Sequence, residues 1–242
     1  VCNAGEEGLG HLKGVHKICE DFGDRIERFC TFDSSLSSIV DRAVGSKRFR
    51  VRVRTRGGHS YDDFGNDNAI AGLASLVGKL YGIRVPEGGK TTYNVGMISG
   101  GTSVNTIAQE AEMLYEFRSD RRENLEYMER QFMEVFDRAK AEGMDVSFKV
   151  IGVRPCEGQV DPKRKQALSD WAHRVVEEMT GQAPKHCAGS TDCNIPLSLG
   201  IPSVCVGSFR GAGAHTWEEY VETDSLEEGY KVAFGMIFGS RD

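Results

Sequence analysis

The clearest pattern in the chain is a strict alternation of apolar and charged residues between positions 46 and 55. Phe49, Val51 and Val53 fall on one side of an extended segment, while every residue between them, and one on either side, is an arginine. A period of two residues is typical of a β-strand with one buried face. We interpret the arginines as the solvated face of that strand.

The hydrophobic pattern after this strand predicts a compact βαββαβ unit. Amphipathic spacing favours helices over residues 66–81 and 123–142, the first capped by Asn66 or Asp67. Apolar alternation favours further strands over 91–98, 111–117 and 145–153. This order describes a ferredoxin-like sandwich, in which two helices cover one face of a four-stranded antiparallel sheet. We place it at residues 46–155.

On both sides of the sandwich the pattern is that of an α/β domain. Helical spacing covers residues 10–22, 163–180 and 225–238, and buried strands are expected at 25–32 and 201–206. A polar loop is expected at 34–38. The sequence therefore predicts one α/β domain in two pieces, residues 1–45 and 156–242, with the sandwich inserted between them.

Composition narrows the class of protein. The 242 residues carry a net charge of -6, which disfavours nucleic acid and anionic membranes as partners. The sequence has no apolar run as long as a membrane span, and we expect no signal peptide. Seven cysteines are scattered without a Cys-x-x-Cys pair. They indicate reduced thiols in a cytoplasmic protein and not a disulfide framework.

The first ten residues hold the strongest candidate chemistry. Val1–Gly10 reads as the end of a buried strand, a tight turn containing Glu6 and Glu7, and the entry to a helix. Adjacent carboxylates that both face a site repel one another, and a divalent cation would offset this repulsion. One carboxylate could then bind the metal while the other acts as a general base. The alternative is a solvated acidic turn.

Two further aspartates follow predicted elements. Asp33 ends a strand, where a carboxylate in an α/β sheet is well placed for a site, although a turn or N-cap role is equally open. Asp192 lies in a Ser-Thr-Asp loop that precedes a short helix. It could line a pocket, or Thr191 or Asp192 could cap that helix.

Five short motifs together resemble one known family. They are Glu-Glu-Gly at 6–8, Gly-Gly-His-Ser at 57–60, Gly-Gly-x-x-x-Asn at 100–105, Ser-Thr-Asp at 190–192 and His-Thr-x-Glu at 215–218. Their order and spacing resemble the zinc aminoacyl/exopeptidase family, which includes glutamate carboxypeptidase, peptidase T, acetylornithine deacetylase and succinyl-diaminopimelate desuccinylase. In that family the sandwich serves as a lid and dimerisation domain.

The resemblance implies a metal centre in the two-piece domain. Glu6 corresponds to the general base and Glu7 to a ligand of the first of two zinc ions. Asp33 and His215 correspond to the carboxylate and imidazole ligands of the second zinc. Cobalt or manganese could replace zinc. Carboxylate and imidazole groups are the ligands that zinc commonly takes in catalytic sites.

The resemblance also assigns residues of the sandwich to the substrate. His59 corresponds to a histidine that reaches across a homodimer to polarise the substrate carbonyl. Asn105 and Arg118 correspond to residues that hold the substrate's carboxylate or the end of its backbone. The expected substrates are small peptides or N-acyl amino acids, cleaved at an amide bond.

A two-fold homodimer is expected to form through the sandwich. The helix at 66–81 is rich in Ala, Gly and Leu on more than one face, and small residues let backbones approach closely. An open antiparallel sheet also leaves an unpaired edge that must be covered or paired. We expect this edge at 91–98 or at 48–54.

One part of the family pattern is missing from this sequence. The first metal pair needs a His-x-Asp and a bridging aspartate, and no histidine here has Asp two residues later. We therefore expect these groups before Val1, with this chain forming the C-terminal two-thirds of such an enzyme. The competing hypothesis is a non-catalytic relative or fragment, in which the sandwich acts as a dimerisation or binding module.

Overall fold

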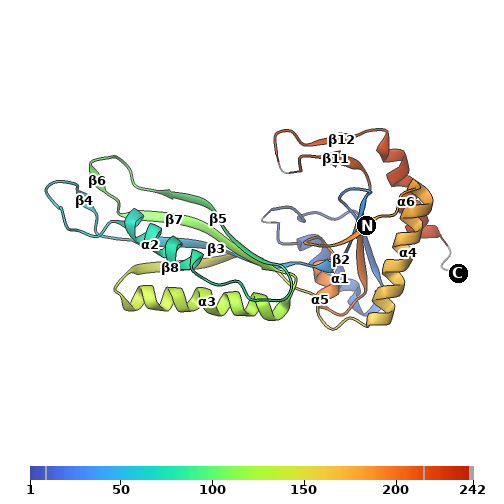
Figure 1. Cartoon of the computed structure of the whole chain (residues 1–242), viewed down its shortest axis with the longest axis horizontal. Helices are drawn as coiled ribbons and strands as arrows, with labels where there is room; N and C mark the ends of the chain where they lie inside the picture. The colour runs from blue at the N-terminus through green and yellow to red at the C-terminus, as the bar shows by residue number, and fades with distance from the viewer. Residues whose placement is uncertain (9, 215, 240–242) are drawn as a thin grey trace. The chain divides into compact units, whose positions relative to one another are not determined.

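The structure is a computed structural model that describes residues 1–8, 10–214 and 216–239 (Figure 1). The chain divides into two compact units. One, which we call the two-piece unit, combines Val1–Val44 with Arg154–Asp242; the other, the inserted unit, is Gly45–Val153. In the described ranges, no helix is both long and apolar enough to cross a membrane.

The inserted unit is the predicted ferredoxin-like sandwich. Its main elements are β3 (Gly45–Arg54), α2 (Ala69–Tyr81), β5 (Thr91–Gly100), β7 (Glu110–Ser119), α3 (Arg122–Ala141) and β8 (Asp145–Arg154). The strands form one sheet in the order β5-β7-β3-β8, with β7 antiparallel to both β5 and β3. This order, in which the first strand lies between the third and the fourth, is that of the βαββαβ sandwich. The predicted fold class is confirmed.

The alternation in β3 separates an apolar face from a charged one. Phe49, Val51 and Val53 are buried, and the Phe49 ring stacks on Phe132 of α3 with ring centroids 4.1 Å apart. On the opposite face the arginines pair with glutamates of β7, for example Arg52 with Glu112 at 2.9 Å. Cross-strand ion pairs of this kind therefore cover the solvated face of the sheet.

Two details of the sandwich differ from the prediction. Helix α2 is capped by Asn68, whose side chain accepts from the backbone N–H groups of Ile70 and Ala71. Asn66, one of the predicted caps, instead donates to the Gly57 carbonyl at 2.8 Å. The segment 48–54, one of the two expected sheet edges, belongs to β3 and lies between β7 and β8; the sheet edges are β5 and β8.

The two-piece unit is a three-layer α/β structure. Its sheet has the order β1-β10-β2-β9, formed by β1 (Phe29–Phe32), β10 (Ser203–Val206), β2 (Ser38–Ala43) and β9 (Lys185–Gly189). Strand pairs β1–β10 and β2–β9 are parallel, and β10–β2 is antiparallel. Figure 1 shows α4 (Pro162–Thr180) and α6 (Ser225–Phe238) lying side by side on one face.

Neighbouring residues of the strands face different layers. Ile39 packs with Trp171 of α4 and Val232 of α6. The next residue, Val40, packs with Leu197 of α5 (Asn194–Ser198). Helix α1 (Lys13–Phe22) packs against α5 through Val15. The remaining elements are the short helix η1 (Gly23–Arg25) and the hairpin of β11 (Arg210–Ala212) with β12 (Tyr220–Glu222).

The predicted strand at the beginning of the chain is not present. Residues 1–6 belong to no strand; the Ala4 carbonyl accepts from Gly14 N–H at 3.1 Å, and that of Gly5 from Leu12 N–H at 2.9 Å. The opening segment therefore hydrogen-bonds to the start of α1 and not to the sheet. Strands β2 and β9 were also not predicted from the sequence.

Candidate active site

The Glu-Glu turn is closed by two glycines. Gly5 has φ +83°, and a Cβ atom added to Gly10 would lie 2.4 Å from the Gly5 carbonyl oxygen. Both positions therefore require glycine. The turn leaves Glu6 half-buried and Glu7 exposed.

Arg154, the last residue of β8, holds Glu6 in place. Its Nη1 donates to Glu6 Oε1 at 2.9 Å, and its Nη2 donates to the Glu6 backbone carbonyl. Nη1 also lies 3.2 Å from Ser190 Oγ and 3.3 Å from the Ser190 carbonyl. Arg154 is 7% exposed, so it joins the Glu-Glu turn to the Ser-Thr-Asp loop in a largely dry environment. Sequence reasoning missed this residue, because no local pattern distinguishes Arg154 from the other arginines.

The Ser-Thr-Asp loop directs Asp192 toward the first residues of the chain. Asn3 Nδ2 donates to Asp192 Oδ2 at 2.8 Å, and Asp192 is buried. Asp192 Oδ1 is also buried and has no hydrogen-bond partner among the described residues. The N-cap of α5 is Cys193, without a side-chain hydrogen bond, so the alternative of Asp192 as an N-cap is wrong.

Asn194 fixes the shape of this loop. Its Oδ1 accepts from Thr191 N–H at 2.9 Å, and its Nδ2 donates to the carbonyls of Val44 and Pro155, both at 2.9 Å. Asn194 is completely buried. The loop that carries Asp192 is therefore rigidly tied to the chain on both sides of the insertion.

Asp33 follows β1 and forms a turn. Its backbone N–H donates to the Val206 carbonyl at 3.1 Å, which extends the pairing with β10. Its Oδ1 accepts from Ser34 N–H at 2.7 Å, and Ser34 has the left-handed φ of +77°. Asp33 is thus a turn residue, as one alternative held, while it also stands at the carboxyl end of a sheet strand.

Electrostatic coupling links these carboxylates. Burial raises the pKa of Glu6; the neighbouring charges of Glu7 and Asp192 raise it further, and Arg154 opposes them. Burial likewise raises the pKa of Asp192, with an added contribution from Asp33 and opposing contributions from Asn3 and Arg154.

Glu7 and Asp192 thus act on Glu6, and Asp33 acts on Asp192, while Arg154 opposes the shift of both Glu6 and Asp192. The four carboxylates come from three separate segments of the chain. His215, the predicted imidazole ligand, lies outside the described residues.

The cluster offers donors for a cation but does not form a complete metal centre. Within residues 1–8, 10–214 and 216–239, no group of three or more His, Cys, Asp or Glu residues is arranged to hold a metal ion. However, the carboxylates outnumber the one arginine, and Asp192 Oδ1 is buried and lacks a partner in the described part of the chain. Oxygen donors with excess negative charge suit a divalent cation, so the residues present fit part of such a site.

In the inserted unit, the structure brings His59 and Asn105 together. Strand β4 (Gly58–His59) pairs with β6 (Thr106–Ile107), and Ser60 N–H donates to the Asn105 carbonyl at 3.0 Å. Both residues are exposed. Figure 1 shows β4 and β6 beyond the ends of β5 and β7, at one end of this unit.

The Gly-Gly-His-Ser loop needs both of its glycines. Gly57 has φ +68° and Gly58 has φ +143°. A Cβ atom on Gly58 would also lie 2.6 Å from the Asp63 Cβ atom. Asp63 in turn accepts from the His59 N–H at 2.8 Å, so this close approach fixes the backbone of His59.

Arg118 does not lie beside His59 and Asn105. It lies near the end of β7, eight residues after Glu110, which corresponds to roughly 27 Å along an antiparallel strand. Its Nε and Nη2 donate to the two carboxylate oxygens of Glu116 at 2.8 and 3.1 Å. Its guanidinium group is therefore already paired with a carboxylate of the same strand.

Parts of this chain match a known protein family and a curated protein. Residues 43–144 match the family model described as "Peptidase dimerisation domain". Over 119 residues the chain is 35% identical to a p-aminobenzoyl-glutamate hydrolase homolog of Haemophilus influenzae, covering 49% of this chain and 26% of that protein.

Solved structures show the same fold. Aminopeptidase PepT of Bacillus cereus matches with a TM-score of 0.71 and 23% identity, and a tripeptidase of Staphylococcus aureus with 0.72 and 21%. Each comparison covers 97% of this chain and 62% of the other. An aminobenzoyl-glutamate utilization protein of Klebsiella pneumoniae matches with a TM-score of 0.66 and 16% identity, over 97% of this chain and 59% of that one.

The chain therefore spans less than two-thirds of the length of these relatives. The family resemblance inferred from the five motifs is confirmed. Residues 43–144 match a peptidase dimerisation domain, and the chain has the fold of the aminopeptidase, the tripeptidase and the aminobenzoyl-glutamate utilization protein.

Proposed function

We propose that this chain belongs to a metal-dependent hydrolase that cleaves an amide bond in small peptides or N-acyl amino acids. The observation that carries the proposal is the cluster of Glu6, Glu7, Asp33 and Asp192, in which burial and mutual repulsion raise the pKa values of Glu6 and Asp192. Carboxylate clusters with shifted pKa values are typical of functional sites. The peptidase and hydrolase relatives support the same reaction class.

In this proposal the two glutamates of the turn have different roles, one as the general base and the other as a metal ligand. Glu6 accepts a proton from the attacking water, and its raised pKa suits this role because an effective base has a pKa closer to the working pH. Glu7 is more exposed and would supply oxygen donors to one metal ion. Asp33 and His215 would supply donors to a second. When bound, zinc, or cobalt or manganese in its place, would act as the Lewis acid that polarises the amide carbonyl.

Arg154 orients the base. It donates to both the carboxylate and the backbone carbonyl of Glu6, so the glutamate has little freedom to rotate. Its positive charge also limits how far the pKa of Glu6 can rise. Arg154 thus favours the ionised form of Glu6, which is the form that can accept a proton.

The inserted unit is proposed to bind substrate and to form a homodimer. His59 and Asn105 lie on neighbouring segments and can offer an imidazole and an amide to the same ligand. Arg118 would have to leave Glu116 to bind a substrate carboxylate. Edge strand β5 exposes Met97 (51%) and Ile98 (55%), so it is the surface that we propose to pair with a second copy.

A purely structural role is the second candidate function. The described residues do not complete a metal centre, and Glu6 is already paired with Arg154. Both observations would suit a relative in which the sandwich acts only as a dimerisation or binding module.

Hydrolysis assays of the intact protein separate the two. A panel of dipeptides, tripeptides and N-acyl amino acids is assayed after treatment with a chelator and again after zinc, cobalt or manganese is restored. Metal-dependent turnover of any of them supports the hydrolase. Absence of turnover with every metal, in a protein that still dimerises, would favour the binding module.

A further inference from the structure

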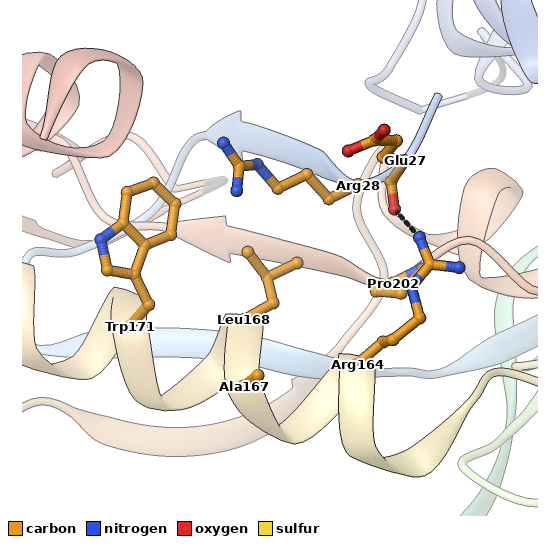
Figure 2. Close-up of a pocket in the computed structure, with 7 residues that line it drawn as sticks. All are labelled: Glu27, Arg28, Arg164, Ala167, Leu168, Trp171 and Pro202. Atoms are coloured by element: carbon orange, nitrogen blue, oxygen red, sulfur yellow. Dashed lines mark hydrogen bonds between the residues drawn. The ribbon is translucent and has the colours of Figure 1, made fainter. Parts of the chain in front are cut away.

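A small hollow lies in the two-piece unit between the start of β1 and the first turns of α4 (Figure 2). Its volume is about 200 Å³. Its walls include Arg28, Arg164, Leu168, Trp171 and Pro202. None of these residues belongs to the carboxylate cluster, so the hollow is a separate feature of the unit.

Arg28 is the most unusual group in this hollow. Its Cζ atom lies 5.1 Å from the centroid of the Trp171 ring, in a cation–π arrangement. Its Nη1 is buried and has no hydrogen-bond partner among the described residues. A buried donor on a charged group costs free energy unless an acceptor is supplied. Arg28 therefore has an unfilled place for an anionic acceptor.

The rest of the hollow is apolar in the middle and charged at the far end. Figure 2 shows Ala167 and Leu168 on α4 between Trp171 at one end and Arg164 at the other. Arg164 and Trp171 are seven residues apart on the helix, which is roughly 10 Å along its axis. Arg28 lies over Trp171, so an anion bound at Arg28 would lie at the end of the hollow opposite Arg164.

Arg164 and Glu27 set the charge that the hollow accepts. Arg164 Nη2 donates to the Glu27 carbonyl at 2.6 Å, which holds this guanidinium group at its end of the hollow, where it adds positive potential. The exposed carboxylate of Glu27 stands on the same wall, and it would repel a second negative charge on a ligand. The positive charges of Arg28 and Arg164 and the negative charge of Glu27 together favour a ligand that has one negative charge and an apolar body.

We infer that this hollow binds a small monocarboxylate, with its carboxylate on Arg28 and its apolar side group over Leu168 and Pro202. The guanidinium fork matches carboxylate geometry, and the apolar floor removes the side group from water. The inference does not depend on the proposed hydrolase activity, because it uses none of the candidate catalytic residues.

Tryptophan fluorescence can report this binding. The chain has two tryptophans: Trp171 lines the hollow and is 4% exposed, whereas Trp217 is fully exposed. The Trp217→Phe variant leaves Trp171 as the single reporter. It is titrated with 4-methylvalerate, with the neutral 4-methylpentanamide of the same shape, and with acetate, which keeps the charge but lacks the apolar body.

We expect a saturable change with 4-methylvalerate, and binding at least about tenfold weaker with the amide and with acetate. Arg28→Met, which keeps the stem over Trp171, should weaken 4-methylvalerate binding by about tenfold or more, measured by calorimetry as well as fluorescence. Arg25→Met is the matched control, because Arg25 also lies over an aromatic ring, that of Phe22 at 5.2 Å, but outside the hollow. Its binding should equal that of the parent.

Three results would overturn the inference. They are no saturable signal with 4-methylvalerate, equal binding of the amide, or equal losses in the Arg28→Met and Arg25→Met variants. If Arg28→Met does not fold, the comparison of acid with amide in the parent protein decides alone. Arg28→Lys then tests whether the forked donor, and not only the charge, is required.

Discussion

Arg154 and Glu6 are 148 residues apart in the sequence, and the Arg154 guanidinium donates to both the Glu6 carboxylate and the Glu6 backbone carbonyl. The contact joins the beginning of the chain to the first residue of the second piece of the two-piece unit. The candidate base is therefore held by a residue that is distant in sequence and that belongs to the same two-piece unit.

Removal of this arginine should destabilise the protein. In Arg154→Met, the partly buried Glu6 carboxylate loses its partner, and we expect the free energy of unfolding to fall by about 2 to 4 kcal/mol. Urea denaturation measures this change. Arg50→Met is the control, since Arg50 is exposed and its partner Glu112, 3.3 Å away, also pairs with Arg52; this variant should cost less than about 1 kcal/mol.

The Arg154–Glu6 pair also predicts that substitutions of the two residues have coupled effects on the free energy of unfolding. Adding Glu6→Gln to Arg154→Met should recover part of the lost stability, because no uncompensated charge then remains. If the two substitutions are simply additive, the loss comes from packing of the arginine and not from its charge.

Asp192 should make stability depend on pH. Its pKa is raised by burial, so the folded protein holds the proton more tightly than the unfolded chain. This contribution is fully present below the ordinary pKa of about 3.9 and is lost as the pH rises through the raised value. Asparagine cannot ionise, so the Asp192→Asn variant does not lose this contribution. Its free energy of unfolding relative to that of the wild type should therefore rise between pH 4 and pH 7.

Chelator-treated protein is used for this comparison, so that metal binding does not contribute. Asp24→Asn, at an exposed position, is the matched control and should leave the pH profile unchanged. A difference between Asp192→Asn and wild type that does not change with pH would contradict the raised pKa.

The Gly-Gly-His-Ser loop gives a prediction about His59. In Gly58→Ala, the new Cβ atom would clash with Asp63, which holds the His59 N–H. We expect turnover of the intact enzyme to fall while its metal content stays the same. Gly143→Ala is the control: φ is also positive there, at +89°, but an added Cβ atom would meet no neighbouring atom within 4 Å. This variant should lose stability, by about 1 kcal/mol, and keep its activity.

Dimerisation through β5 can be tested by placing a charged residue on this edge strand. Ile98→Arg places a cation on the exposed edge strand, and we expect light scattering to show a monomer where the wild-type protein is a dimer. Val150→Arg, on the opposite edge strand β8 and 39% exposed, should leave the dimer intact. The reverse outcome would move the interface to β8.

The sandwich was predictable because its signals are local. Phe49, Val51 and Val53 show the period of a strand by themselves, and the two helices repeat every three or four residues. The cap of α2 was misplaced by one or two residues because Asn66, Asp67 and Asn68 are all good caps, and only the tertiary contact of Asn66 with Gly57 distinguishes them.

The two-piece unit was harder to predict because its short strands take their character from their neighbours. β9 (Lys-His-Cys-Ala-Gly) has no alternation of its own and is defined by pairing with β2. Arg154 was missed, and the hydrogen bond of Asp192 with Asn3 was not predicted, for a similar reason. Both residues make contacts across more than a hundred residues, and no local pattern encodes such contacts.

The central claim is that Glu6 is the base and Glu7 a metal ligand, and one comparison tests it most directly. Zinc content and kcat are measured side by side for the intact wild-type enzyme and for its Glu6→Ala and Glu7→Ala variants. We predict that Glu6→Ala lowers kcat by about 10²- to 10⁴-fold with nearly unchanged zinc, whereas Glu7→Ala loses zinc. Equal zinc loss in both variants, or full activity of Glu6→Ala, would contradict this assignment.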